Sequence, residues 1–204
     1  MARMDLRLLY TGLSLFFLLT SCGNRAERQS DLKSFDLVGL VESQVIFLTD
    51  NEYQLIKKSS LGPSDDLAEY VPDSAGWVRE MSILRTADIS KPGLRSYYAL
   101  DSYDSLDYTI EHYNLLESGN SNTIYQKIYR DAASDQLLKI KALQNVSNPI
   151  YDSKRYLEIT FQEVGKDTEI IDSIVVRGYQ TMILSDTVIY ESISKILPGK
   201  KPSK

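Results

Sequence analysis

The sequence is poor in the residues that build catalytic and metal sites. Its 204 residues include one Cys, one His and one Trp. One His and one Cys cannot fill the soft ligand positions of a zinc site, and one Cys cannot build a disulfide framework. Gly (10) and Pro (6) are few, 43% of the residues are hydrophobic and 25% are charged. This composition excludes collagen and wholesale disorder and indicates an ordinary globular chain.

Positive charge is also scarce. Lys and Arg total 23 against 28 Asp and Glu, which gives a net charge of -5 at pH 7. Such a chain has no overall field that would attract nucleic acid or anionic lipid headgroups. We therefore expect no nucleic-acid partner.

The one long apolar run lies at the amino terminus. Arg3 and Arg7 precede Leu8–Thr20, a run of 13 residues that is followed by polar sequence. A membrane-spanning helix needs about 20 apolar residues, so this run is too short to span. Charge followed by a short apolar run predicts a secretory signal peptide.

The sole cysteine lies where this run ends. Leu19, Thr20, Ser21 and Cys22 resemble the lipobox of bacterial lipoproteins. The resemblance implies that lipoprotein signal peptidase recognises Leu19, Thr20 and Ser21 and that Cys22 carries the lipid. The alternative is that Cys22 is a buried free thiol or half of a disulfide.

This resemblance also implies a location and an order of segments. Residues 1–21 would be the signal peptide, and residues 22–30 would be the lipidated cysteine and a polar tether. Gly23 follows the cysteine, where an Asp retains some lipoproteins at the inner membrane. The expected location is the cell envelope, at the outer membrane, on either its periplasmic face or its surface.

Two amphipathic helices are predicted near the start of residues 31–196, which we expect to form a single domain. The first spans 32–50 and begins after Ser30 or Asp31. One apolar stripe runs along it and consists of Phe35, Val38, Val41, Val45 and Leu48. Leu37, Leu40 and Ile46 widen this stripe. The second follows an Asp73 or Ser74 cap and carries Trp77, Met81 and Leu84.

The rest of the domain predicts antiparallel strands. A first hairpin is expected from 53–61 and 67–71, around a Gly-Pro turn. The clearest alternation is 156–164, whereas 169–177 and 180–184 are predicted as separate strands. Residues 197–204 lack a core pattern and predict a disordered tail.

These elements predict an α+β fold. Its core would be a curved antiparallel β-sheet of about eight strands in meander order, an incomplete barrel covered by the two helices. The order of elements is similar to that of small uncharacterised Bacteroidota envelope lipoproteins, and loosely to that of the half-barrel carriers of the lipoprotein-localisation pathway. This second likeness rests on the order of elements, without residue motifs.

Catalytic motifs are not found around the sole histidine. The sequence contains no G-x-S-x-G motif, no H-E-x-x-H motif and no glycine-rich phosphate loop that would act together with His112. A strand histidine beside tyrosine is more often a packed side chain than a general base. Two S-x-x-K spacings, Ser30 with Lys33 and Ser192 with Lys195, lack their companion motifs and are attributed to chance.

Acidic residues give one weaker candidate. Asp101, Asp104 and Asp107 recur at every third residue across a turn, a spacing that can collect three carboxylates around a hard cation such as calcium. They lack the ligand pattern of an EF-hand loop, and Asp is common in turns because it bonds its own backbone. We favour a solvated turn, and expect neither a metal nor a cofactor.

Tyrosine is the one compositional excess, with 14 residues against 5 Phe. The candidate ligand or partner surface consists of Tyr97, Tyr98, Tyr103, Tyr108 and Tyr113, and Tyr125 and Tyr129 lie in the same dense region. Tyrosine suits a binding surface because the ring is apolar and its tip is polar. It is also a favoured strand residue, so a scaffold role for these side chains is the alternative.

The sequence therefore predicts a non-enzymatic outer-membrane lipoprotein that binds an apolar ligand or an envelope protein through its sheet. A structural subunit without a ligand is the main alternative, and a hydrolase is a weaker one. A carrier would keep a cavity lined by inward residues, whereas a scaffold would fill that space and present tyrosines outside. A hydrolase would bring His112 beside a serine and an acid.

Overall fold

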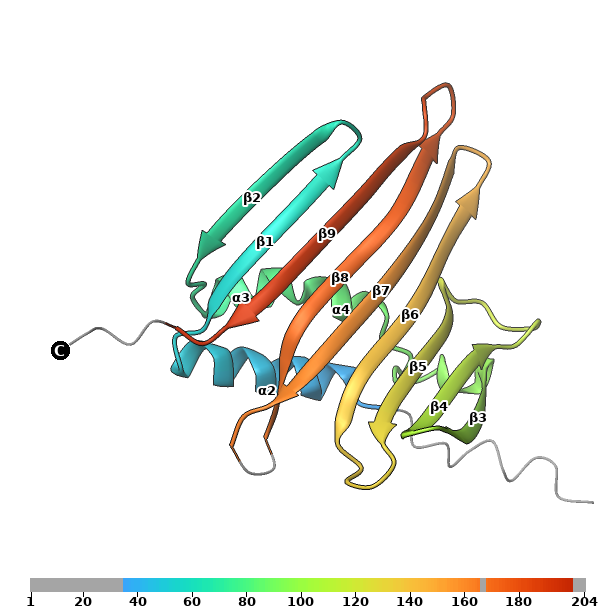
Figure 1. Ribbon diagram of the computed structural model, residues 1–204. Coiled ribbons are helices and arrows are strands. Elements are labelled where there is room, and N and C mark those ends of the chain that lie inside the picture. The colour runs from blue at the N-terminus through green and yellow to red at the C-terminus, as the bar shows by residue number, and fades with distance from the viewer. Residues whose placement is uncertain (1–34, 166–167, 200–204) are drawn as a thin grey trace, which may run out of the picture. The chain divides into compact units, whose positions relative to one another are not determined.

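Strands make up most of the protein. The structure is a computed structural model that describes residues 35–165 and 168–199. Nine antiparallel strands form one sheet in the order β2-β1-β9-β8-β7-β6-β5-β4-β3 (Figure 1). The sheet does not close, because β2 and β3 are its two edges. The antiparallel sheet is as predicted, with nine strands in place of about eight.

The described elements all belong to one compact unit. The helical elements are α2 (Leu37–Asp50), α3 (Ser74–Glu80), α4 (Ser82–Thr86) and the 3-10 turn η1 (Arg95–Tyr97). The strands are β1 (Gln54–Leu61), β2 (Ser64–Tyr70), β3 (Tyr98–Ser105), β4 (Tyr108–Leu115), β5 (Thr123–Asp131), β6 (Leu137–Asn148), β7 (Tyr151–Glu163), β8 (Glu169–Met182) and β9 (Val188–Leu197).

The strand order departs from the predicted meander at one place. Strands β3 to β9 follow one another in the sheet, but the β1–β2 hairpin lies beside β9. Since β2 and β3 lie at opposite edges, the segment that carries α3 and α4 must cross the sheet. Leu197 pairs with Gln54, so the predicted tail is wrong at that residue, and residues 200–204 lie outside the described part of the chain.

Aspartate side chains begin the helices, as the sequence suggests, but at different positions. Asp36 caps α2 by accepting a hydrogen bond from the Gly39 N–H at 2.9 Å, so the predicted start at residue 32 is wrong. Asp73 caps α3 through the Gly76 N–H at 2.7 Å, as predicted. The predicted second helix divides into α3 and α4 at Met81.

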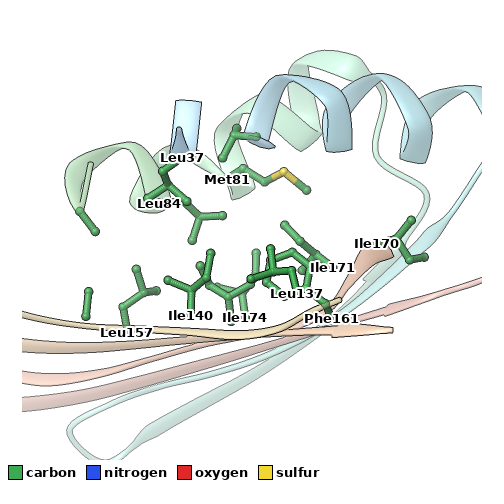
Figure 2. Packing of buried hydrophobic residues seen from close by; sticks show 14 of the residues in the cluster. Leu37, Met81, Leu84, Leu137, Ile140, Leu157, Phe161, Ile170, Ile171 and Ile174 are labelled. Carbon is green, nitrogen blue, oxygen red and sulfur yellow. The ribbon is translucent and has the colours of Figure 1, made fainter. Parts of the chain in front are cut away.

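The core lies between the helices and one face of the sheet, here called the inner face. Figure 2 shows Leu37, Met81 and Leu84 of the helices pointing toward Ile140 and Ile174 of the sheet. All five of these side chains are buried in one hydrophobic cluster. Burial of this kind removes large apolar side chains from water and is the main term that favours folding.

The apolar stripe of α2 is only partly as predicted. Val41, Val45 and Leu48 are buried, as is Leu37, whereas Phe35 and Val38 are half-buried. Ile46 is 63% exposed and does not widen the stripe.

A buried glutamine joins α2 to the sheet. Strand β9 pairs with β8 only from Ser173 onward, so the first residues of β8 have no β9 partner. The Gln44 side chain lies at this place. Its Oε1 accepts from the Ile171 N–H at 2.8 Å and its Nε2 donates to the Glu169 carbonyl at 3.0 Å. The Gln44 amide thus takes the place of a neighbouring strand as hydrogen-bond partner for two backbone groups of β8. Buried backbone groups require such partners.

The packing of α2 predicts opposite effects for two substitutions in the same helix. Val41→Asp should reduce the free energy of unfolding by more than about 3 kcal/mol, because a carboxylate would replace a fully buried apolar side chain. Ile46→Asp should change it by less than about 1 kcal/mol, since Ile46 is exposed. Urea unfolding followed by the fluorescence of the buried Trp77 measures both; equal stability of the two variants would contradict this packing.

Candidate binding surfaces

The residues of the predicted lipid anchor are not described by the structure. Leu19, Thr20, Ser21 and Cys22 lie outside the described residues, and the anchor stays a prediction. Within residues 35–165 and 168–199, no helix combines the length and the hydrophobicity that crossing a bilayer requires.

The five predicted tyrosines do not form one surface. Tyr98 and Tyr113 are 1% and 2% exposed and belong to the core cluster. Tyr97, in η1, is half-buried against that cluster. Tyr103 and Tyr108 are 42% and 39% exposed on the outer face of the sheet. The prediction of a tyrosine surface is therefore wrong for Tyr98 and Tyr113.

The two buried tyrosines serve the core. The Tyr98 hydroxyl donates to the Thr123 carbonyl at 2.6 Å, and the Tyr113 hydroxyl donates to the Glu111 carboxylate at 2.9 Å. Burial raises the pKa of Tyr98. Burial, followed by the interaction with Glu111, raises the pKa of Tyr113 well above its ordinary value. Both hydroxyls therefore stay protonated and act as hydrogen-bond donors.

The outer face carries a different group of aromatic and basic side chains. Ile128, Ile140 and Leu157 belong to the core on the inner face. Because successive strand residues point to opposite faces of a sheet, the residues next to them along each strand lie on the outer face. We call this outer group the tyrosine–lysine surface; it consists of Tyr103, Tyr108, Tyr125, Tyr129, Tyr156, Lys127, Lys139, Lys141 and Glu158. Tyr125, Tyr129 and Tyr156 are absent from the five tyrosines predicted as a surface.

Tyr129 is the centre of this surface. Its ring meets the Tyr108 ring edge-on, with centroids 6.2 Å apart at 88°. The Nζ atoms of Lys139 and Lys141 lie 5.9 and 5.8 Å from the Tyr129 centroid, within the range of a cation–π attraction. Ile110 pairs with Tyr129 across the strands and is only 6% exposed, because the outer aromatic side chains surround it.

One carboxylate links the lysines to a tyrosine. Glu158 accepts from the Tyr156 hydroxyl at 2.9 Å and lies 3.3 Å from the Lys141 Nζ. Burial opposes ionisation of Glu158, but the hydrogen bonds from Tyr156 and Lys141 and the lysine charges outweigh burial and lower its pKa. Burial likewise opposes the charge of Lys141, but its interactions with Tyr156 and Glu158 raise its pKa. These groups stay charged at neutral pH.

His112 lies in the same region without an acid–base arrangement. Its ring meets Tyr125 edge-on at 5.8 Å, and its buried Nε2 has no hydrogen-bond partner among the described residues. Burial and then the charge of Lys127 lower the pKa of His112, and Asp101 opposes this. The arrangement is that of a packed neutral ring.

The remaining sequence candidates are not assembled into sites. Ser192 and Lys195 point to opposite faces of β9, and Lys195 pairs with Asp172 at 2.6 Å. Ser30 and Lys33 lie outside the described residues. Among the described residues, no three His, Cys, Asp or Glu side chains are placed to hold a metal ion, the three aspartates of the β3–β4 hairpin included.

A second candidate, which we call the Arg155 pocket, lies on the inner face beyond the helices. In Figure 1 the helices lie across the lower part of the sheet, and the β1–β2, β6–β7 and β8–β9 hairpins extend past them. The pocket has a volume of about 210 Å³ and is lined by Thr86, Asn122, Gln144, Val146, Tyr151, Ser153 and Arg155. Arg155 is the one charged residue in this lining.

Neighbouring strands hold Arg155 in place. Gln144, Arg155, Gly178 and Tyr190 follow one another across β6, β7, β8 and β9. The Arg155 Nε donates to the Tyr190 hydroxyl at 3.2 Å, and its Nη1 donates to the Gln144 Oε1 at 3.4 Å. Tyr190 reaches Arg155 across Gly178, where a Cβ would lie 2.6 Å from the tyrosine oxygen.

The sequence analysis does not identify this pocket, because it begins the strand at residue 156. Extending the alternation of Leu157 and Ile159 toward the amino terminus would place Arg155 and Ser153 on the same inner face. An arginine at a strand position that alternates with buried apolar residues is the sequence signal that would have indicated this pocket.

Comparison with known proteins adds no assignment. No protein-family model, no curated protein and no solved structure matches this chain. The functional argument therefore starts from the residues of the chain itself.

Proposed function

We propose that the protein is a lipid-anchored lipoprotein of the outer membrane, without enzymatic activity, that binds an envelope protein through the tyrosine–lysine surface. The observation that carries the binding proposal is the outer sheet face, which has partly exposed tyrosines, two lysines paired with one carboxylate, and a third lysine against the Tyr125 ring. Tyrosine is enriched in protein interfaces because it offers a large apolar area and a polar tip.

The filled inner face favours a protein partner over an apolar ligand. Ile140, Leu157, Ile159 and Ile174 are at most 3% exposed, in the cluster that also holds the buried side chains of the helices. An apolar ligand of ordinary size would need this space, since ligand sites are concave and mostly apolar. We take the sheet and its helix cover as an incomplete barrel whose interior is occupied by its own side chains.

The charges of the outer face indicate the chemistry of the partner. Lys127, Lys139 and Lys141 lie on a chain whose net charge is -5, and they are opposed by Glu158 and, beside His112, by Asp101. A partner that presents acidic side chains would complement this local positive charge. We therefore commit to an acidic protein segment as the occupant, and a structural subunit without any ligand is the alternative.

The proposed anchor rests on the lipobox resemblance. One acyl chain binds a membrane only marginally, but the two or three chains of a bacterial lipoprotein make a stable anchor. Such an anchor would hold the sheet at the membrane without a spanning protein segment.

A substitution at Cys22 tests the anchor. Cys22→Ala should abolish incorporation of labelled palmitate and leave the chain uncleaved or soluble, because the thiol that would accept the lipid is gone. Ser21→Ala, which keeps a small residue before the cysteine, should retain labelling. Membrane fractionation and fatty-acid labelling measure both, and unchanged labelling of the Cys22→Ala chain would contradict the anchor.

A charge reversal on the tyrosine–lysine surface tests the binding proposal. After crosslinking in cells, full-length tagged protein should capture a defined protein partner, and Lys139→Glu should reduce this capture by at least about tenfold. Lys58→Glu is the matched control, because exposed Lys58 lies on β1, four strands and therefore roughly 19 Å from β6.

Mass spectrometry of captured proteins and lipids gives the readout. Equal capture by both variants would contradict the proposed surface. Copurification of a lipid in place of a protein would favour the carrier alternative. Trp77 fluorescence confirms that each variant is folded, since Trp77 lies in the core.

A further inference from the structure

We infer that the Arg155 pocket binds an oxyanion, the carboxylate or phosphate group of a small molecule or of a lipid headgroup. This site lies on the opposite face of the sheet from the tyrosine–lysine surface, and the inference does not depend on the proposed protein partner.

Unused donors are the first argument. A guanidinium has five N–H groups, and Arg155 uses one toward Tyr190 and one toward Gln144. The other three have no acceptor among the described residues. A planar guanidinium with free N–H groups is the preferred protein group for carboxylate and phosphate, which it binds in a bidentate manner.

A serine beside Arg155 adds a second donor. Ser153 lies two residues before Arg155 on the same face of β7, and the residue is 6% exposed. Ser153 lines the pocket, and its hydroxyl makes no hydrogen bond within the described part of the chain. Asn122, which is exposed, belongs to the same lining. Both side chains can donate hydrogen bonds to the oxygens of a bound anion.

The pocket holds no opposing charge. Its lining contains Arg155 and no Asp or Glu, and Arg155 makes no ion pair within the described residues. The seven salt bridges of the described residues involve other cations, so no carboxylate among those residues neutralises the charge of Arg155. Because the chain as a whole is acidic, a bound anion would be held by this local field and not by overall attraction.

The site is held in place before any ligand arrives. Gln144 is 5% exposed, and its Nε2 donates to the Thr86 carbonyl at 2.7 Å, so its Oε1 has a fixed direction toward Arg155. Tyr190 fixes the Nε side from β9. A side chain fixed from two strands loses little further freedom on binding, which favours affinity. The volume of about 210 Å³ fits a small anion or a headgroup phosphate, but not a large ligand.

Titration of the full-length protein in an uncharged detergent tests the inference. The probes are inorganic phosphate and acetate, with chloride as the ionic-strength control, and mixed micelles that contain phosphatidylglycerol or phosphatidylcholine. Isothermal titration calorimetry should show binding of an oxyanion and not of chloride or phosphatidylcholine. Arg155→Gln should weaken this binding by at least about tenfold, and Ser153→Ala by a smaller factor.

Lys154→Gln is the matched control, because it removes one positive charge from the adjacent residue, whose side chain points to the outer face. It should leave the affinity unchanged. Binding of the soluble anions would identify a free oxyanion as the ligand, and binding only of phosphatidylglycerol micelles would identify a headgroup. Absence of binding to every probe, or equal weakening by Arg155→Gln and Lys154→Gln in folded protein, would overturn the inference. Ser153→Ala breaks no hydrogen bond, so it keeps the test decisive if Arg155→Gln does not fold.

Discussion

The pairing of β1 with β9 determines how the rest of the chain must run. Eight residue pairs join the two strands, from Gln54 with Leu197 to Leu61 with Tyr190. This pairing places the first hairpin at one edge of the sheet, while β3 begins the other edge. The segment between β2 and β3 therefore has to pass the seven strands that lie between these edges, and it carries α3 and α4 over the inner face. Apolar residues of α2, α3 and α4 then join apolar residues of the inner face in one hydrophobic cluster.

The same constraint leaves two regions of the sheet uncovered. No helix of residues 35–165 and 168–199 covers the outer face, and there the alternation of strand residues exposes tyrosines and lysines around Tyr129. On the inner face the helices stop short of the hairpins (Figure 1). Past the ends of the helices, the inward side chains of neighbouring strands change from apolar to mostly polar. Arg155 lies in this row, next to buried Leu157 on the same face of β7. The filled core and the two candidate binding sites are thus consequences of one topology.

How much of this can be predicted from the sequence depends on how local the deciding interaction is. Helical spacing predicts the burial of Val41 and Trp77, because the period of a helix is set within a few residues. The sequence analysis separates 169–177 from 180–184, yet both belong to β8, which continues through Gly178, where the missing Cβ makes room for a tyrosine from β9. The burial of Tyr98 and the inward direction of Arg155 depend on where strands begin and pair, which only contacts distant in sequence decide.

Disulfide formation between β1 and β9 tests the central pairing most directly. Ser59 and Ser192 are register partners with their hydroxyl oxygens 3.5 Å apart, so cysteines at both positions have the proximity that a disulfide requires. In a full-length Cys22→Ala chain, Ser59→Cys with Ser192→Cys should oxidise readily to one intrachain disulfide, identified by mass spectrometry of peptides. Ser60→Cys with Ser192→Cys should remain reduced, because residue 60 faces the other side of the sheet. Free thiols in the folded first variant, or equal crosslinking in both, would contradict the pairing and the architecture built on it.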